Sequence, residues 1–366
     1  MRFIGVKEIK NIAVGAALLG AGGGGNAYVG TLMAISAVRK HGPIKLLDPD
    51  ELADDAFCVC SSHIGAPAVS AEKFPNGNEL ITSFKKMQAV LGKHVDATFP
   101  IEIGGMNSML PMVVAAKANI PLVDVDAMGR AFPEIQMSTF VLAGHPITPI
   151  VMADERGNTT LLDTIDAYWA EKLGRAITVK MGASAFMTST PLTGLDLKRD
   201  GVKHSLSFCE QIGDLITNIN KFTSLAEGLE KLLTLTHGYQ LLKAKVVDIQ
   251  HTTKDGFNYG TVKLNGLDHD SGRVGTIDFQ NENIIFKVDD QIRTTAPDLI
   301  SLVDSDTLVP ITNEELSYGK RVYVLGLPCD AKWRTPAGIK LVGPRYFKYN
   351  VDYVPLEELI SMKGGI

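Results

Sequence analysis

Residues Thr98–Asp126 read TFPIEIGGMNSMLPMVVAAKANIPLVDVD, and they carry the clearest indication of fold class in this 366-residue chain. Thr98–Ile103 is a short apolar run that ends at two glycines, which predicts a buried strand followed by a turn. Met109–Ala118 has the composition of a helix, and Pro121–Asp126 predicts another strand. Strands and helices in alternation are typical of a mostly parallel sheet that is covered by helices.

The residues before this stretch continue the alternation. Helical spacing of apolar residues predicts three helices, and short apolar runs predict two strands. In chain order these elements are Val6–Leu19, Ala27–Lys40, Ile44–Leu47, Ala56–Cys60 and Asn78–Leu91. We therefore predict an α/β N-terminal domain over residues 1–168.

The second half of the chain has a different pattern. Residues 201–235 contain two amphipathic helices, and residues 241–355 consist of β-forming runs separated by turn sequences such as Lys254-Asp255-Gly256. This order predicts an α+β, β-rich C-terminal domain with antiparallel strands over residues 169–366.

Charge and composition exclude several classes of protein. The 36 basic and 41 acidic residues give a formal net charge of −5, which excludes a broadly basic nucleic-acid-binding protein and argues against a polybasic membrane surface. The N-terminal residues lack the apolar core of a signal peptide, and the four cysteines lack the spacing of a zinc module. We expect a cytoplasmic protein with reduced thiols. The sequence leaves open whether it forms a homo-oligomer.

The glycine-rich loop at residues 20–25 fits the G-x-G-x-x-G template of dinucleotide-binding loops. That fingerprint requires a preceding strand, whereas the residues before this loop favour a helix. NAD binding, with Asp48 on the ribose, is therefore disfavoured but kept as an alternative. A second interpretation is a turn that permits close packing. We prefer a third interpretation, in which the loop binds an anion or a polarised substrate atom through Gly22, Gly23, Gly24, Gly25 and Asn26.

Polar residues follow both strands of the opening stretch. Glu102 and Asn107 follow the first strand, and Asp124 and Asp126 lie two residues apart at the end of the second. Ligands bind at the carboxyl ends of such strands, and neighbouring carboxylates separate their pKa values in a way that suits acid–base catalysis. The alternative is a buried polar network in which an Asp caps a helix. The candidates are Glu102, Asn107, Asp124, Asp126, Arg130, Glu134 and Gln136.

The cysteines and histidines give weaker indications. Cys58 and Cys60 lie in a predicted strand, where buried cysteines are more often core residues than nucleophiles. His63 follows this strand and is a candidate base or ligand, and His145 is a weaker one. No metal-binding motif is present. The cofactor is therefore unknown, and a divalent metal held by His63, Glu102, Asp124 and Asp126 is left open.

Several of these motifs together resemble the S-methyl thiohydantoin desulfurase family. In the first half they are LLGAGGGGNAYVG, EIGGMNS and DVDAMGRAFPEIQM; in the second they are GFNYGTVKL, FQNENI and EELSYGKRVYVLGLP. The family was long catalogued as a domain of unknown function and is associated with hydantoinase and oxoprolinase-type enzymes. The resemblance covers roughly Val6–Tyr353. It implies an α/β domain, a β-rich second domain and hydrolytic desulfurisation of a thiohydantoin ring. One departure is Asn26, where members often carry an acidic residue.

The expected activity is hydrolysis of a small cyclic amide, with water attacking the ring carbon that bears sulfur. Asp124 or Asp126 would act as base or metal ligand, and Glu102 would protonate the leaving sulfur. His63 is the fourth catalytic candidate. The substrate-binding residues would be Asn107, Arg130, Glu134 and Gln136 beside the glycine loop. Alternatives are a protein that binds a hydantoin or nucleotide without turnover, and a nicotinamide-dependent oxidoreductase that uses Gly20–Gly25. Neither nucleic acid nor a membrane is expected as a partner.

Overall fold

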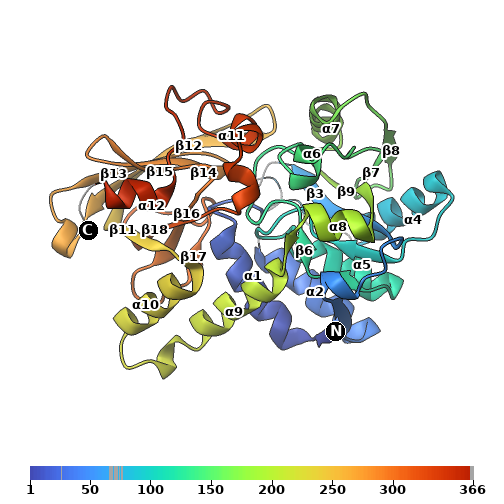
Figure 1. The fold of residues 1–366 in the computed structure, drawn as a ribbon, viewed down its shortest axis with the longest axis horizontal. Helices are drawn as coiled ribbons and strands as arrows, with labels where there is room; N and C mark the ends of the chain where they lie inside the picture. Colours follow the sequence, from blue (N-terminus) through green and yellow to red (C-terminus); the bar gives the residue numbers. More distant parts are fainter. Residues whose placement is uncertain (26, 66–68, 70–72, 74, 76, 363–366) are drawn as a thin grey trace.

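The computed structural model describes residues 1–25, 27–65, 69, 73, 75 and 77–362, and it contains two eight-stranded sheets (Figure 1). The first sheet has a parallel centre, β2-β5-β4-β3, and antiparallel pairs on both sides of it. In spatial order its strands are β1 (Arg2–Ile4), β2 (Ile44–Leu47), β5 (Leu122–Val123), β4 (Ala97–Phe99), β3 (Phe57–Gly65), β9 (Ser184–Thr193), β7 (Ile150–Ala153) and β8 (Thr159–Leu162).

Helices pack around this first sheet. They are α1 (Val6–Leu19), α2 (Ala27–His41), α4 (Glu79–Leu91), α5 (Leu110–Ala118), α6 (Thr139–Leu142), α7 (Ala167–Lys180) and α8 (Gly194–Asp200). Two of them end at a residue in the left-handed conformation, Gly92 after α4 and Asn119 after α5, as is common for helix C-termini. Among the described residues, no helix is both long enough and apolar enough to cross a membrane.

The second sheet is entirely antiparallel. In spatial order its strands are β15 (Gln291–Thr295), β14 (Glu282–Val288), β13 (Val274–Gln280), β12 (Phe257–Gly266), β11 (Tyr239–Lys254), β18 (Arg321–Leu327), β16 (Leu299–Asp304) and β17 (Pro310–Ile311). The helices of this half are α9 (Ser205–Thr217), α10 (Leu225–Thr236), α11 (Pro336–Val342) and α12 (Leu356–Ser361). The predicted order of an α/β part followed by a β-rich part is confirmed.

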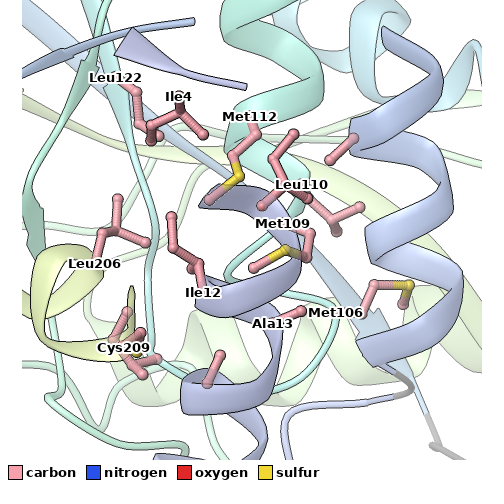
Figure 2. Close-up of a cluster of buried hydrophobic side chains, with 14 of the residues drawn as sticks. Ile4, Ile12, Ala13, Met106, Met109, Leu110, Met112, Leu122, Leu206 and Cys209 are labelled. Atoms are coloured by element: carbon pink, nitrogen blue, oxygen red, sulfur yellow. The ribbon is translucent and has the colours of Figure 1, made fainter. Parts of the chain in front are cut away.

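Helix α1 belongs to the core of both halves. A Cβ on Gly15 would come within 2.0 Å of Cys209 O in α9, so the two helices touch backbone to backbone. Figure 2 shows Ile12 of α1 and Cys209 in one apolar cluster with Met109 and Met112. The same cluster extends to residues of β16 and β18 in the second sheet. The end of α1 is also tied to that sheet, because the Ser301 hydroxyl donates to Leu18 O at 2.7 Å.

The first sheet takes strands from both sides of residues 168/169, where the domain boundary is predicted. Strand β9 lies between β3 and β7, so residues up to Thr193 are needed to complete the first sheet. Helix α9 then packs on α1, and the second sheet begins at Tyr239. The sequence pattern changed character near residue 201, but pattern alone does not show which sheet an antiparallel strand joins.

The glycine-rich loop and the Gly104-Gly105 turn are packed against each other without intervening side chains. A Cβ on Gly24 would lie 2.4 Å from Gly104 C, and a Cβ on Gly105 would lie 1.9 Å from Gly25 O. Met106 N donates to Gly24 O at 2.9 Å across this contact. Gly24 and Gly25 have φ of +85° and +80°, which glycine adopts readily. The predicted strand Thr98–Ile103 therefore ends at Phe99, and the chain turns to meet the loop.

Replacing Gly105 by alanine tests this contact, with Gly92→Ala as the matched control. Both glycines have positive φ, but a Cβ on Gly92 would meet no atom within 4 Å. Gly105→Ala should therefore lower the free energy of unfolding by about 1–3 kcal/mol more than Gly92→Ala, because of overpacking. Urea unfolding of both variants measures the difference. Equal losses would show that the backbone contact contributes nothing beyond conformational strain.

Candidate functional site

One cavity lies where the glycine loop, the ends of β3 and β4, and the β13–β14 hairpin meet. Its apolar lining includes Ile101, Met128, Phe132 and Met187. Its polar lining comes from both halves of the molecule and consists of Ser62, His63, Glu102, Asn107, Glu134, Arg175, Asn281 and Glu282, with Gly24 and Gly25. The cavity thus collects several predicted site residues together with others that were not predicted.

Glu102 is a buried carboxyl group held by two hydrogen bonds. Its Oε1 accepts from Asn107 Nδ2 at 2.7 Å, and its Oε2 accepts from Phe132 N at 3.4 Å. Asn107 is fixed in turn by the backbone of His63, which donates to Asn107 Oδ1 at 2.7 Å. Burial raises the pKa of Glu102 to about 7, and the hydrogen bonds offset only part of that shift.

Glu282 is the second carboxyl group of the cavity and was missed by the sequence analysis. It begins β14, it is 3% exposed, and its Oε1 accepts from Gly24 N at 3.2 Å. Among the described residues, its Oε2 has no hydrogen-bond partner. Burial raises the pKa of Glu282 well above its usual range, and the charge of Glu102 raises it further. The available signal was the polar run Gln280-Asn281-Glu282-Asn283 between apolar strands.

The two carboxyl groups share their protons unequally. The Asn107 amide donates to Glu102 at 2.7 Å, a shorter hydrogen bond than the 3.2 Å bond from Gly24 N to Glu282. Hydrogen bonds of this kind favour the ionised form, so the proton resides on Glu282 when the pair holds one. Near neutral pH the cavity therefore presents a carboxylic acid beside a carboxylate.

His63 lies beside this pair as a neutral imidazole. Its Nε2 is 2.8 Å from Ser184 Oγ, and its ring meets Phe186 edge-on. Burial lowers the pKa of His63 to about 3, with the positive charges of Arg175 and Lys73 acting in the same direction. The ring therefore carries no positive charge at neutral pH.

The neighbouring thiols of Cys58 and Cys60 are buried, and burial raises their pKa values to about 12 and about 11.

The structure does not bring Asp124 and Asp126 into the cavity lining. The predicted strand breaks between them, so that Asp126 lies in β6 (Val125–Asp126), which pairs with β10 (Val202–Lys203) in a separate two-stranded sheet. Asp124 caps α9, where its Oδ1 accepts from the amides of Leu206 at 2.9 Å and Ser207 at 3.1 Å. Asp126 Oδ2 accepts from the amides of Met128 and Gly129 at 2.8 and 2.7 Å.

Arg130 joins the two halves and does not line the cavity. The guanidinium is fully buried, and it donates to Pro297 O at 2.7 Å and Asp298 O at 2.9 Å. Burial lowers its pKa to about 10. Glu134 lines the cavity, whereas Gln136 lies behind it and donates to Glu134.

The glycine loop contributes unequally to the cavity. Gly24 and Gly25 line it, whereas Gly22 packs against Asn283 and Asn313 and Gly23 packs against Glu282. Asn26 lies outside the described residues. The element before the loop is helix α1, which differs from the strand of a dinucleotide-binding fingerprint.

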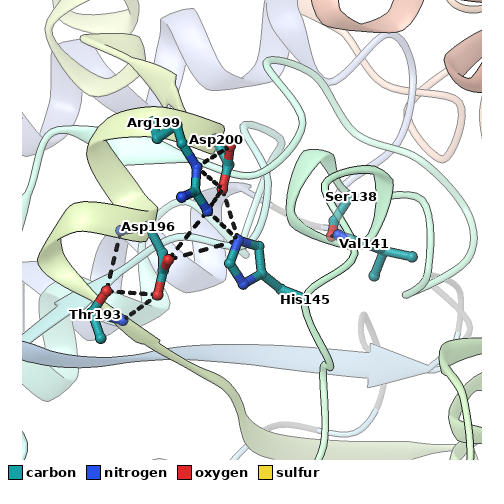
Figure 3. A network of polar contacts seen from close by, with 7 residues as sticks. All are labelled: Ser138, Val141, His145, Thr193, Asp196, Arg199 and Asp200. Carbon is teal, nitrogen blue, oxygen red and sulfur yellow. Dashed lines mark hydrogen bonds and ion pairs between the residues drawn. The ribbon is translucent and has the colours of Figure 1, made fainter.

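The four predicted metal candidates do not form a cluster of ligand atoms. Within the described part of the chain, a group of three or more potential ligands occurs at His145, Asp196 and Asp200 instead. Figure 3 shows that Arg199 already occupies the centre of this group, where it is 2.7 Å from Asp200 Oδ2 and 3.4 Å from Asp196 Oδ1. His145 Nε2 lies 2.7 Å from Asp200 Oδ2. The single guanidinium offsets part of the negative charge of the two carboxylates, and its contact with His145 Nε2 at 3.2 Å links α8 to the loop that carries His145.

Comparison with known proteins places both halves in one family. The model of the S-Me-THD-like N-terminal domain matches residues 7–164, and that of the S-Me-THD-like C-terminal domain matches residues 165–356. An X-ray structure of a protein from Chromobacterium violaceum is similar in fold, with a TM-score of 0.82. It shares 22% sequence identity, and the match covers 97% of this chain and 100% of that one. A comparison with curated proteins gave no match.

The pH dependence of stability tests the environment of Asp126. Burial raises its pKa to about 7, so ionisation is disfavoured in the folded state and the free energy of unfolding falls as pH rises towards 7. Asparagine cannot ionise, yet its Oδ1 can accept the same two amide bonds. The free energy of unfolding of Asp126→Asn, relative to that of the wild type, should therefore increase by about 2–3 kcal/mol between pH 5 and pH 8. Urea unfolding at a series of pH values measures this difference.

Glu227→Gln is the control for this measurement. Its hydrogen bond with Lys231 lowers the pKa of Glu227 to about 2, so the group is ionised in both the folded and unfolded states from pH 5 to 8. The stability difference between this variant and the wild type should stay constant over that range. An equally constant difference for Asp126→Asn would contradict the raised pKa.

Proposed function

The chain belongs to the S-Me-THD-like family, and on this premise we propose that it hydrolyses an S-methyl thiohydantoin to a hydantoin and methanethiol. The observation that carries the proposal is the pair of buried carboxyl groups, Glu102 and Glu282, in one cavity between the two halves. Hydrolysis at the sulfur-bearing carbon needs a base for water and an acid for the ring nitrogen. A carboxylate beside a carboxylic acid supplies both functions near neutral pH.

In the proposed first step, Glu102 takes a proton from water as the water oxygen bonds to the ring carbon that bears sulfur. The electron pair of the C=N bond moves to the ring nitrogen, which takes the proton of Glu282. This gives a tetrahedral intermediate that carries a hydroxyl group and the methylthio group. Asn107 and Phe132 N hold the Glu102 carboxylate in place, and Gly24 N holds the carboxyl group of Glu282.

In the second step, the hydroxyl group of the intermediate returns a proton to Glu282 as the carbonyl forms. The C–S bond breaks, and the leaving thiolate takes the proton that Glu102 received from water. Both carboxyl groups thereby regain their initial protonation states, and the products are a hydantoin and methanethiol. His63, whose Nε2 is already engaged with Ser184, remains neutral and lines the cavity as an uncharged polar group.

Conversion of either carboxyl group to an amide should abolish most turnover. Glu102→Gln and Glu282→Gln should each lower kcat by about 10²-fold or more, the usual contribution of a general acid or base. The assay is mass spectrometry of products from a panel of S-methyl thiohydantoins, thiohydantoins and hydantoins. The control is Asp270→Asn, a buried acid that bonds Lys243 N and Arg273 outside the cavity lining and should leave kcat unchanged. Binding without any product in the wild type would indicate a ligand-binding protein instead.

The pH profile distinguishes the two carboxyl groups. Glu102 must be ionised to act as the base, so kcat/KM should rise with pH, reach half of its plateau near pH 7 and level off about one pH unit higher. The rising limb should follow the pKa of Glu102 in the free enzyme. A profile that falls between pH 5 and 7 would reverse the assignment of base and acid.

A further inference from the structure

One further segment of the cavity lining carries a charge that is not balanced. This segment consists of Pro133, Glu134 and Ile135, with Arg175 beside it. Arg175 is already paired, because its Nε donates to Glu171 Oε1 at 2.7 Å and its Nη2 donates to Pro133 O at 3.1 Å. Glu171 is itself buried. The Arg175–Glu171 pair therefore adds no net charge to this part of the lining.

Because the Arg175–Glu171 pair is neutral overall, the carboxylate of Glu134 is the unbalanced charge in this part of the lining. Its Oε2 accepts a hydrogen bond from the hydroxyl of Tyr346 at 2.6 Å and another from Gln136, both neutral groups. Within the described ranges, Glu134 makes no ion pair and its Oε1 accepts no hydrogen bond from the protein. Burial raises the pKa values of Tyr259 and Tyr346, and the negative charge of Glu134 raises them further.

We propose that Glu134 selects substrates whose ring substituent ends in a cation, such as a protonated amine. The inference rests on the proposed function and names the substrate class of the same site. Glu134 lines the same cavity as Glu102 and Glu282, so a substituent on a ring held between that pair would share the cavity with Glu134. A partly buried carboxylate with an open oxygen pairs favourably with an ammonium group and repels a carboxylate.

The experiment compares three S-methyl thiohydantoins that differ only at the ring substituent: 4-aminobutyl, pentyl and 3-carboxypropyl. With the wild-type protein, kcat/KM should be about tenfold or more higher for the aminobutyl compound than for the pentyl compound, and lowest for the carboxypropyl compound. The difference should lie mainly in KM, because Glu134 contacts the substituent and not the reacting carbon. Equal values, or a preference for the carboxylate, would overturn the proposal.

Variants connect the preference to this one carboxylate. Glu134→Gln should reduce the ratio of aminobutyl to pentyl kcat/KM to about one, whereas Tyr346→Phe, which keeps the charge, should preserve a ratio above one. A preference that survives in Glu134→Gln would overturn the role of Glu134. The wild-type order decides the charge preference even where the variant fails to fold.

Binding of the three corresponding hydantoins, measured by calorimetry, separates this inference from the proposed reaction. Tightest binding of the aminobutyl hydantoin supports the charge selection even in the absence of turnover. Turnover of all three thiohydantoins without charge preference would leave the reaction standing and remove the selection.

Discussion

The backbone contact between the Gly20–Gly25 loop and the Gly104-Gly105 turn sets the position of everything around the cavity. With no side chains between them, the two segments approach within the distance that a single Cβ would fill. The same loop is bonded to the second half, because Asn283 N donates to Ala21 O at 2.8 Å and Asn313 N donates to Gly22 O at 2.9 Å. Glu102 lies two residues before the Gly104-Gly105 turn, and Glu282 lies next to Asn283, which bonds the glycine loop from the second half. The cavity therefore receives one carboxyl group from each half.

Buried charge is the main energetic cost of this arrangement. Glu102, Glu282 and Arg130 are withdrawn from water around one interface, and each would be strongly unfavourable without its neighbours. Arg130 is surrounded mainly by backbone carbonyls of the second half, and its charge lies near those of Glu282 and Glu102. Burial raises the pKa of Glu102, and the hydrogen bonds from Asn107 and Phe132 limit that rise more than the positive charge of Arg130 does.

Local patterns in the sequence predicted the elements well and the site only in part. Helix α1 has the predicted bounds, Val6–Leu19, because its apolar spacing and alanine content act within the helix itself. The grouping of Asp124 with Asp126 depended on an unbroken strand, whereas Asp124 N donates to Leu47 O and the next residues join a different sheet. Glu282 could not be paired with Glu102 because nothing local in a sequence indicates which distant segments meet. The resemblance supplied the motif FQNENI but no role for its glutamate.

The position of α1 in both cores has a consequence for biosynthesis. This helix is synthesised before every strand of the second sheet, yet part of its surface packs against β16 and β17 of that sheet. Until those strands are made, that surface has no native partner in the second sheet, and exposed apolar surface of this kind favours aggregation or chaperone binding. The native packing of α1 is therefore completed only after β16 and β17 have been synthesised, and the nascent chain depends on whatever covers α1 until then.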